Sequence, residues 1–305
     1  MSHDTGKTGN SANVGGILCW TRGAGHQPSG FGLSMTITFK KPPLAEIVAE
    51  VRWAIGDNPA TTGENSASAP VMDLRALLFT KSSDELFMSL GGKVHSAGFT
   101  RSERVVPPGF PPVAGQVVWR YRKGEHSPEL LQVGNGVFSA NCVPPYSSWD
   151  EFSETVELGI KAIVATRTEL GEKTPFTQVS LRYIDAFGEE LLGGKSYADF
   201  VAEILGFKLA LPKGILEVAD PAGDPQVAFQ ATVPLKDNMQ MTVNVGAGLV
   251  QNVPVLLMDT TVGCTKPIEV GADPVMQALN SAHDVIRKTF LTLTEKIHDR
   301  MQPSK

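Results

Sequence analysis

Long apolar runs, charged residues and cysteines are all scarce in this sequence, and each shortage excludes a class of protein. No apolar run reaches about eighteen residues, so no segment is expected to cross a membrane. Charged residues are only 19% of the 305, and the net charge of -5 argues against general binding to nucleic acid phosphates. The first residues lack a basic stretch followed by an apolar one, so export is not expected.

The three cysteines, Cys19, Cys142 and Cys264, lie far apart and form neither a CxxC pair nor a cluster with histidine. Neither a disulfide framework nor a zinc site is therefore expected, and reduced thiols are typical of a cytoplasmic protein. The sequence also contains no HExxH, GxSxG or P-loop motif. We therefore assign no catalytic residue, no metal ligand and no cofactor.

Composition divides the chain into three parts. Residues 1–34 are rich in Gly, Ser, Asn and Thr, and such a segment cannot bury enough apolar area to offset its chain entropy. We expect a disordered tail there, and Met35 is a candidate for the true initiator. Residues 35–190 and 191–305 are expected to form an N-terminal and a C-terminal α+β half.

Alternating apolar and polar residues predict several strands. Ile47–Trp53 and Val117–Arg122 alternate clearly, and Leu131–Ala140 is expected to be a hairpin partner of the latter. Val179–Ile184 alternates in the same way. Further strands are predicted at Val227–Leu235, Met239–Val245 and Val253–Val262, with a turn at 236–238 and a turn or bulge at 246–248.

Two helices have clear signals. Ser148 and Glu151 form a capping box ahead of an apolar stripe that begins at Phe152. The longest apolar stripe runs from Val275 to Met301, with Asp273 as its expected N-cap. These patterns predict an α+β fold in which antiparallel sheet elements pack against helices on one face. Two similar halves are compatible with the pattern, although no residue-level repeat establishes a duplication.

Four segments together resemble a sporadically distributed, uncharacterised bacterial protein family. They are Phe39–Glu46 (FKKPPLAE), Pro144–Phe152 (PPYSSWDEF), Leu181–Asp185 (LRYID) and the last helix around His283 and Phe290. Asp185 departs from the pattern, where asparagine is more usual. The resemblance implies an accessory gene of the kind found in mobile elements, toxin–antitoxin pairs or anti-phage systems, and it carries no catalytic residues.

Arg182 and Asp185 are the first candidate binding residues. In an ideal strand they lie on opposite faces, so they are not expected to pair. Arg182 could hold a carboxylate or phosphate, but a bond to a neighbouring strand or loop is the favoured interpretation.

Three aromatic or imidazole side chains are further candidates: Tyr146, Trp149 and His283. Tyr146 and Trp149 could form an aromatic recognition patch, although a hydrophobic staple and helix packing are favoured. His283 is interpreted as a structural histidine on a helix flank rather than a general base.

A basic concentration near the second strand is the last candidate. It comprises Arg101, Arg104, Arg120, Arg122 and Lys123, interleaved with Trp119 and Tyr121. Stacking on single-stranded nucleic acid is one interpretation, but alternation places the aromatic rings on the opposite face from the arginines.

The sequence therefore favours a cytoplasmic, non-enzymatic interaction or sensor component of a bacterial accessory system. We expect a protein partner or a second copy to bind through the C-terminal helix. Membrane binding is not expected, and nucleic acid is a disfavoured partner that the sequence leaves open. The alternative is an enzyme with a dispersed polar site, for which Arg182, Asp185, His283 and Glu46 are the residues to inspect. A nucleic-acid-binding module is the third interpretation.

Overall fold

A computed structural model describes residues 37–55, 74–107, 110, 112–208, 212–218, 220 and 228–304. Thr38–Lys305 forms one compact unit. The tail predicted at residues 1–34, the alternative start at Met35 and residues 56–73 lie outside the described residues.

Nine strands form one antiparallel sheet, which confirms the predicted α+β class. The strands are β1 (Leu44–Trp53), β2 (Arg101–Arg104), β3 (Val117–Arg122), β4 (Glu129–Gly134), β5 (Val137–Cys142), β6 (Phe176–Phe187), β7 (Ala228–Pro234), β8 (Met239–Val250) and β9 (Val253–Cys264). Their order across the sheet is β2-β3-β4-β5-β1-β6-β9-β8-β7.

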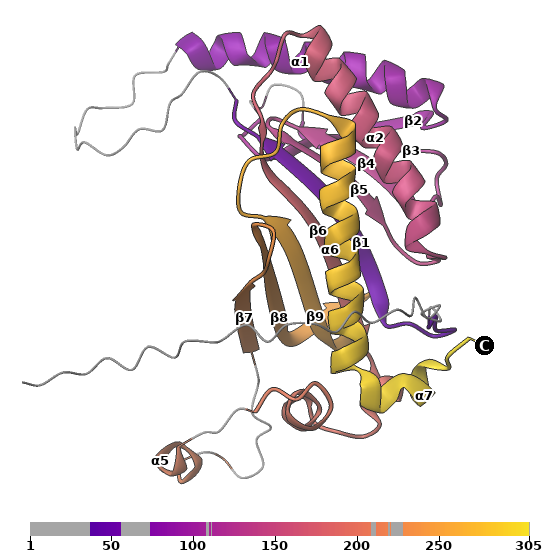
Figure 1. Ribbon diagram of the computed structural model, residues 1–305, viewed down its shortest axis with the longest axis vertical. Helices are drawn as coiled ribbons and strands as arrows, with labels where there is room; N and C mark the ends of the chain where they lie inside the picture. Colours follow the sequence, from indigo (N-terminus) through magenta and orange to yellow (C-terminus); the bar gives the residue numbers. More distant parts are fainter. Residues whose placement is uncertain are drawn as a thin grey trace, which may run out of the picture. The chain divides into compact units, whose positions relative to one another are not determined.

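The long helices cover one face of this sheet (Figure 1). The helices are α1 (Leu74–Ser96), α2 (Trp149–Glu169), α3 (Glu189–Leu192), α4 (Tyr197–Asp199), the π-helix η1 (Phe200–Ile204), α5 (Lys213–Leu216), α6 (Ala272–Leu293), the 3-10 helix η2 (Glu295–Ile297) and α7 (His298–Met301). Helix α1 contacts β3 and β4, α2 contacts β4 and β5, and α6 contacts β6 and β9. No helix that the structure describes packs on the opposite face, which we call the uncovered face.

The order of elements occurs twice along the chain. The first series runs β1, α1, β2 to β5 and α2, and the second runs β6, α3 to α5, β7 to β9 and α6. In the sheet the two series meet at the β1–β6 pair and extend outward in the same order. The second series starts at Phe176, and the predicted division into residues 35–190 and 191–305 stays a prediction.

Helices α2 and α6 share four buried positions, counted from their first residues. The fourth residues are Phe152 and Val275, the eighth Val156 and Leu279, the eleventh Gly159 and Ala282, and the fifteenth Ile163 and Ile286, and all are buried. This shared stripe places both helices on the sheet in the same way. The twelfth position differs, because Ile160 in α2 is buried while His283 in α6 is only partly buried.

The core lies between the helices and the sheet, and it contains one fully buried charge. The Arg167 guanidinium lies between the rings of Trp53 and Phe176, 4.8 and 4.9 Å from their centroids. Its Nε donates to Glu172 at 3.1 Å and its Nη2 to the Thr174 carbonyl at 2.7 Å. Burial lowers the pKa of Arg167, and within the described part of the chain its Nη1 has no hydrogen-bond partner.

Several local predictions are confirmed. On β1 the residues Ile47, Ala49, Val51 and Trp53 are buried, as the alternation predicted. The Ser148 side chain caps α2 by accepting from the Glu151 amide at 3.2 Å.

One strand prediction and one turn prediction are wrong. Residues 131–140 do not form one strand, because the chain turns back at Asn135–Gly136, a dipeptide typical of two-residue hairpin turns. Gly246–Gly248 lies inside β8 rather than in a turn, and the actual turn is at Gln251–Asn252, where φ is 51° and 65°. Gly248 serves close packing, since a Cβ there would lie 2.3 Å from Leu257 Cδ1.

The helix boundaries also differ from the predictions. Helix α1 lacked a clear apolar stripe and was not predicted at all. The N-cap of α6 is Gly271 rather than Asp273, and α6 ends at Leu293 instead of continuing to residue 301. Buried Thr294 follows this end, and its amide and its hydroxyl both donate to the Phe290 carbonyl.

Candidate binding site

A cavity with a volume of about 740 Å³ lies at one end of the sheet. We call it the end pocket. Its lining comprises Lys41, Pro42, Pro43, Leu44, Ala45, Val143, Pro144, Ala186, Gly188, Glu190, Leu191, Val250, Gln251, Val253 and Val255. These residues come from the start of β1, the ends of β5 and β6, helix α3 and the β8–β9 hairpin.

Strand pairing explains why a cavity forms there. The β6–β9 ladder stops at the pair Phe187–Leu256, whereas the β8–β9 ladder continues to Val250–Val253. The tip of the β8–β9 hairpin therefore extends past β6. On the other side, the Ala186 amide donates to the Pro43 carbonyl at 2.7 Å and fixes the proline pair beside β6.

The lining of the end pocket is mostly aliphatic or proline, with one ion pair. Lys41 Nζ lies 2.6 Å from Glu190 Oε1, and both side chains are largely exposed, so the pair contributes little to stability. Val143 and Val253 are 40% and 58% exposed. Binding pockets have comparable volumes and predominantly apolar walls with few polar groups. The arrangement suits aliphatic groups of a ligand or partner.

A second cluster lies on the helix-covered side, where α2 and α6 face β6. The Trp149 ring stacks on the His283 imidazole at 5.0 Å and 8°, and its Nε1 donates to Asn280 at 2.9 Å. The Tyr183 hydroxyl is hydrogen-bonded to His283 Nδ1 at 2.8 Å. Burial lowers the pKa of His283, so the imidazole is neutral at pH 7.

Tyr146 joins this cluster through Tyr183. Burial raises the pKa of Tyr146 to about 12 and that of Tyr183 well above 10, although the hydrogen bond to Tyr183 partly offsets the shift at Tyr146. Tyr146 is partly buried against the main core, and Trp149 is 8% exposed. Both rings are thus occupied by the protein's own packing, which favours the packing interpretation over an exposed recognition patch.

Asp185 is buried on the same side of the sheet, next to Leu44 of β1 and Met258 of β9. Burial raises the pKa of its carboxyl to about 7, and no hydrogen bond from described neighbours offsets that effect. Asp185 increases the pKa of Tyr183 through its charge, so it lies within electrostatic reach of the aromatic cluster.

Arg182 lies on the uncovered face and forms a two-point pair with Asp259 of β9. The Nε–Oδ1 and Nη2–Oδ2 distances are 2.8 and 2.5 Å, and this contact raises the pKa of Arg182. Glu46 is on the same face, near Arg182. The four residues of the enzyme interpretation are therefore split by the sheet, with Arg182 and Glu46 on one side and Asp185 and His283 on the other.

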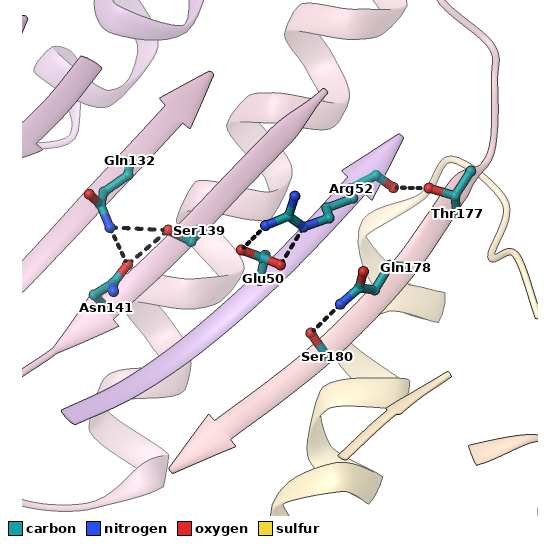
Figure 2. A network of polar contacts seen from close by, with 8 residues as sticks. All are labelled: Glu50, Arg52, Gln132, Ser139, Asn141, Thr177, Gln178 and Ser180. Atoms are coloured by element: carbon teal, nitrogen blue, oxygen red, sulfur yellow. Dashed lines mark hydrogen bonds and ion pairs between the residues drawn. The ribbon is translucent and has the colours of Figure 1, made fainter. Parts of the chain in front are cut away.

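Polar side chains on the uncovered face bond to one another. Figure 2 shows Gln132, Ser139 and Asn141 linked across β4 and β5, while Glu50 pairs with Arg52 along β1. Asn141 also donates to Glu46 at 2.8 Å. The donors and acceptors are largely satisfied within the sheet, so the face is polar and its charges are balanced.

Three residues of the basic concentration, Arg101, Arg120 and Arg122, line a separate hollow of about 570 Å³ at the β2 edge. Acidic residues accompany its arginines, and Arg101 lies 3.2 Å from Glu125. Tyr121 is buried on the other side, where its hydroxyl donates to the Phe87 carbonyl at 3.0 Å. The Tyr121 ring is therefore not exposed in the hollow and is not available there to stack on a nucleic acid base.

Comparison with known proteins does not assign the site: no family model, no curated protein and no solved structure matches this chain. In the described ranges, no helix is long and apolar enough to cross a membrane. No group of three or more His, Cys, Asp or Glu residues in the same ranges could hold a metal ion.

Four predicted candidates lie near one another, and one does not. Tyr146, Trp149 and His283 meet Tyr183 at the α2–α6 contact, with Asp185 nearby, whereas Arg182 is on the opposite face. The end pocket was not predicted as a site. Its prolines, Pro42, Pro43 and Pro144, were visible in the sequence, but their proximity depends on strands that pair far apart in the chain.

Proposed function

We propose that this protein is a non-enzymatic interaction module whose end pocket binds an extended aliphatic segment of a partner protein. The observation that carries the proposal is the end pocket itself, a cavity of about 740 Å³ with mainly aliphatic and proline walls. Its rim exposes Val143 and Val253. Exposed apolar groups around a concave site are typical of surfaces that bind a partner.

The partner's expected chemistry follows from the walls. Valine, leucine and proline side chains offer dispersion contacts and few hydrogen bonds, which favours Leu, Ile, Val or Pro side chains over charged ones. Lys41 and Glu190 provide one charge of each sign at the mouth, so neither sign of partner charge is favoured overall.

A partner binding through the C-terminal helix stays a proposal with less support. The apolar stripe of α6 is used by the protein's own core, from Val275 to Ile286. Its most exposed described side chains, such as Gln277, Asp284 and Lys288, are polar.

The cellular setting is also proposed. The described cysteines, Cys142 and Cys264, are unpaired, which supports a reducing, cytoplasmic location. The family resemblance supports a component of a bacterial accessory system, such as a toxin–antitoxin or anti-phage system. Neighbouring genes in the native host, inspected for a toxin or nuclease, would test that setting.

Binding with matched variants tests the end pocket. A partner that co-purifies from the native host is purified and titrated against wild-type protein, Val143→Glu, Val253→Glu and the control Met88→Glu. Met88 is 80% exposed on α1 and does not line the end pocket. A buried charge in an apolar contact should weaken binding at least tenfold, or by about 1.4 kcal/mol.

The control should bind like wild type, and all variants should keep the wild-type melting temperature. Equal affinity of all four proteins would overturn the proposal, as would selective loss of binding in the Met88 variant.

A further inference from the structure

The two outer strands of the sheet differ in how they are protected from other chains. Strand β2 has only four residues, and three of them, Arg101, Glu103 and Arg104, are charged and exposed. Short, charged edge strands resist pairing with further strands. Strand β7 has seven residues, AFQATVP, and none is charged.

The position beyond β7 has no described occupant. In the first series β2 pairs with the outer edge of β3, whereas in the second series β7 is the last strand that the structure describes. An edge of this length presents unpaired N–H and C=O groups to solvent, which favours pairing with another strand.

The sequence of β7 is complementary to itself when two copies run antiparallel. Centred on Ala231, the pairing places Phe229 opposite Val233 and Gln230 opposite Thr232 of the second copy. Phe229 and Val233 lie on the helix-covered side, and Gln230 and Thr232 lie on the uncovered face. Aromatic–β-branched pairs are among the favourable cross-strand pairs, and this register opposes no like charges.

We propose that two copies of this chain associate edge to edge through β7 into one continuous antiparallel sheet. The contact is isologous, because the same strand is used twice around a two-fold axis at Ala231. The assembly closes as a dimer, since its outer edges are then the charged β2 strands. Val233, which is 41% exposed in one copy, is covered by Phe229 of the second copy. The uncovered faces lie on the same side and become continuous.

Charge substitutions at the two-fold axis test the dimer. Sedimentation velocity and light scattering would be measured on full-length wild type, Ala231→Lys, Ala231→Glu and an equimolar mixture of the two variants. Each single variant opposes like charges and should raise the dimer dissociation constant at least tenfold, whereas the mixture should form a heterodimer. Ser102→Lys, a charge added at the other edge, should leave the dimer unchanged.

Folding is monitored by circular dichroism, and Val233→Lys provides a second edge variant if Ala231 substitutions unfold the chain. A wild-type monomer at every concentration would overturn the proposal. A dimer that Ala231→Lys, Ala231→Glu and Val233→Lys all leave intact would also overturn it. This inference does not depend on the end pocket, since loss of dimerisation and loss of partner binding are measured separately.

Discussion

The first and second series build half-sheets of the same strand order with different interiors, although the first has five strands and the second four. On β1 the side chains that face the helices are apolar from Ile47 to Trp53, whereas β6 places Tyr183 and Asp185 between Leu181 and Phe187. The long helix of each series shows the same difference in polarity, because the twelfth residue is the apolar Ile160 in α2 and the polar His283 in α6. One architecture thus tolerates an apolar interior in one half and a polar cluster in the other, provided that the polar groups find partners.

In the last turns of α2 and α6 the difference in polarity is reversed, with the polar residue in α2 and the apolar one in α6. The last turn of α2 contains the buried charge of Arg167, whereas the last turn of α6 contains Phe290, which packs against Phe39 at 6.3 Å. Each half therefore includes one polar feature that the other lacks. Four substitutions test what these differences contribute.

Arg167→Ala is expected to have the largest effect. It removes three hydrogen bonds and leaves a cavity between the Trp53 and Phe176 rings, at a cost of about 3–5 kcal/mol in the free energy of unfolding. Urea denaturation followed by tryptophan fluorescence measures it. Lys161→Ala, an exposed position on the same helix, is the control and should leave the midpoint unchanged. A loss below about 1 kcal/mol would contradict a packing role for the guanidinium.

Asp185→Asn should change the pH dependence of stability. The folded carboxyl has a pKa of about 7, against an unfolded value of about 3.9, so the folded state binds the proton more tightly. Stability should therefore fall as pH rises from about 4 to about 7 and then level off. The asparagine variant should lack this fall and be more stable than wild type at pH 8, by roughly 2–4 kcal/mol.

His283 acts in the opposite direction, because a lowered folded pKa destabilises the protein as pH falls below about 6.5. Thermal melts of wild type and Asp185→Asn from pH 4 to pH 9 separate the two groups, since the variant should keep the acid loss of His283. Glu154→Gln, which removes an exposed carboxyl on α2, is the control. Parallel curves for wild type and Asp185→Asn would show that Asp185 does not titrate in this range.

The eleventh residues of α2 and α6 should give the smallest effect. Gly159→Ala places a Cβ 2.5 Å from Phe138 Cζ, so it should destabilise by about 1–2 kcal/mol despite the better helix propensity of alanine. Ala282→Gly should cost about 1–2 kcal/mol through lower helix propensity and the loss of a buried methyl group. Chemical denaturation of both variants measures the difference. A stabilising Gly159→Ala would show that α2 can move away from β5.

Much of the fold was predictable because the signals are local. Alternation placed β1 and β3, and Ser148 with Glu151 placed the start of α2. The predictions were wrong where a turn signal was overlooked inside an expected strand, or where packing between strands overrode an apparent turn signal. Asn135–Gly136 was read as part of a strand, and the glycines at 246–248 as a turn, although Gly248 is needed under Leu257.

The candidate residues were predictable only in part. Tyr146, Trp149, Asp185 and His283 were selected from different segments, and the strand register and helix packing decide that they approach one another. The end pocket was not predictable, because its walls come from segments whose contacts are set by non-local strand pairing.

The sequence by itself determined the elements: the faces of the strands, the stripes of α2 and α6, and the absence of charge on β7. The strand faces and helix stripes follow from side-chain periods of about 2 and 3.6 residues, which a short stretch of sequence is enough to reveal. The tertiary structure alone decided that β1 pairs with β6, that Arg182 and Asp185 lie on opposite sides of the sheet, and that the β8–β9 hairpin extends past β6. Those outcomes depend on hydrogen bonds and packing between residues far apart in the chain, for which a single sequence has no local signal.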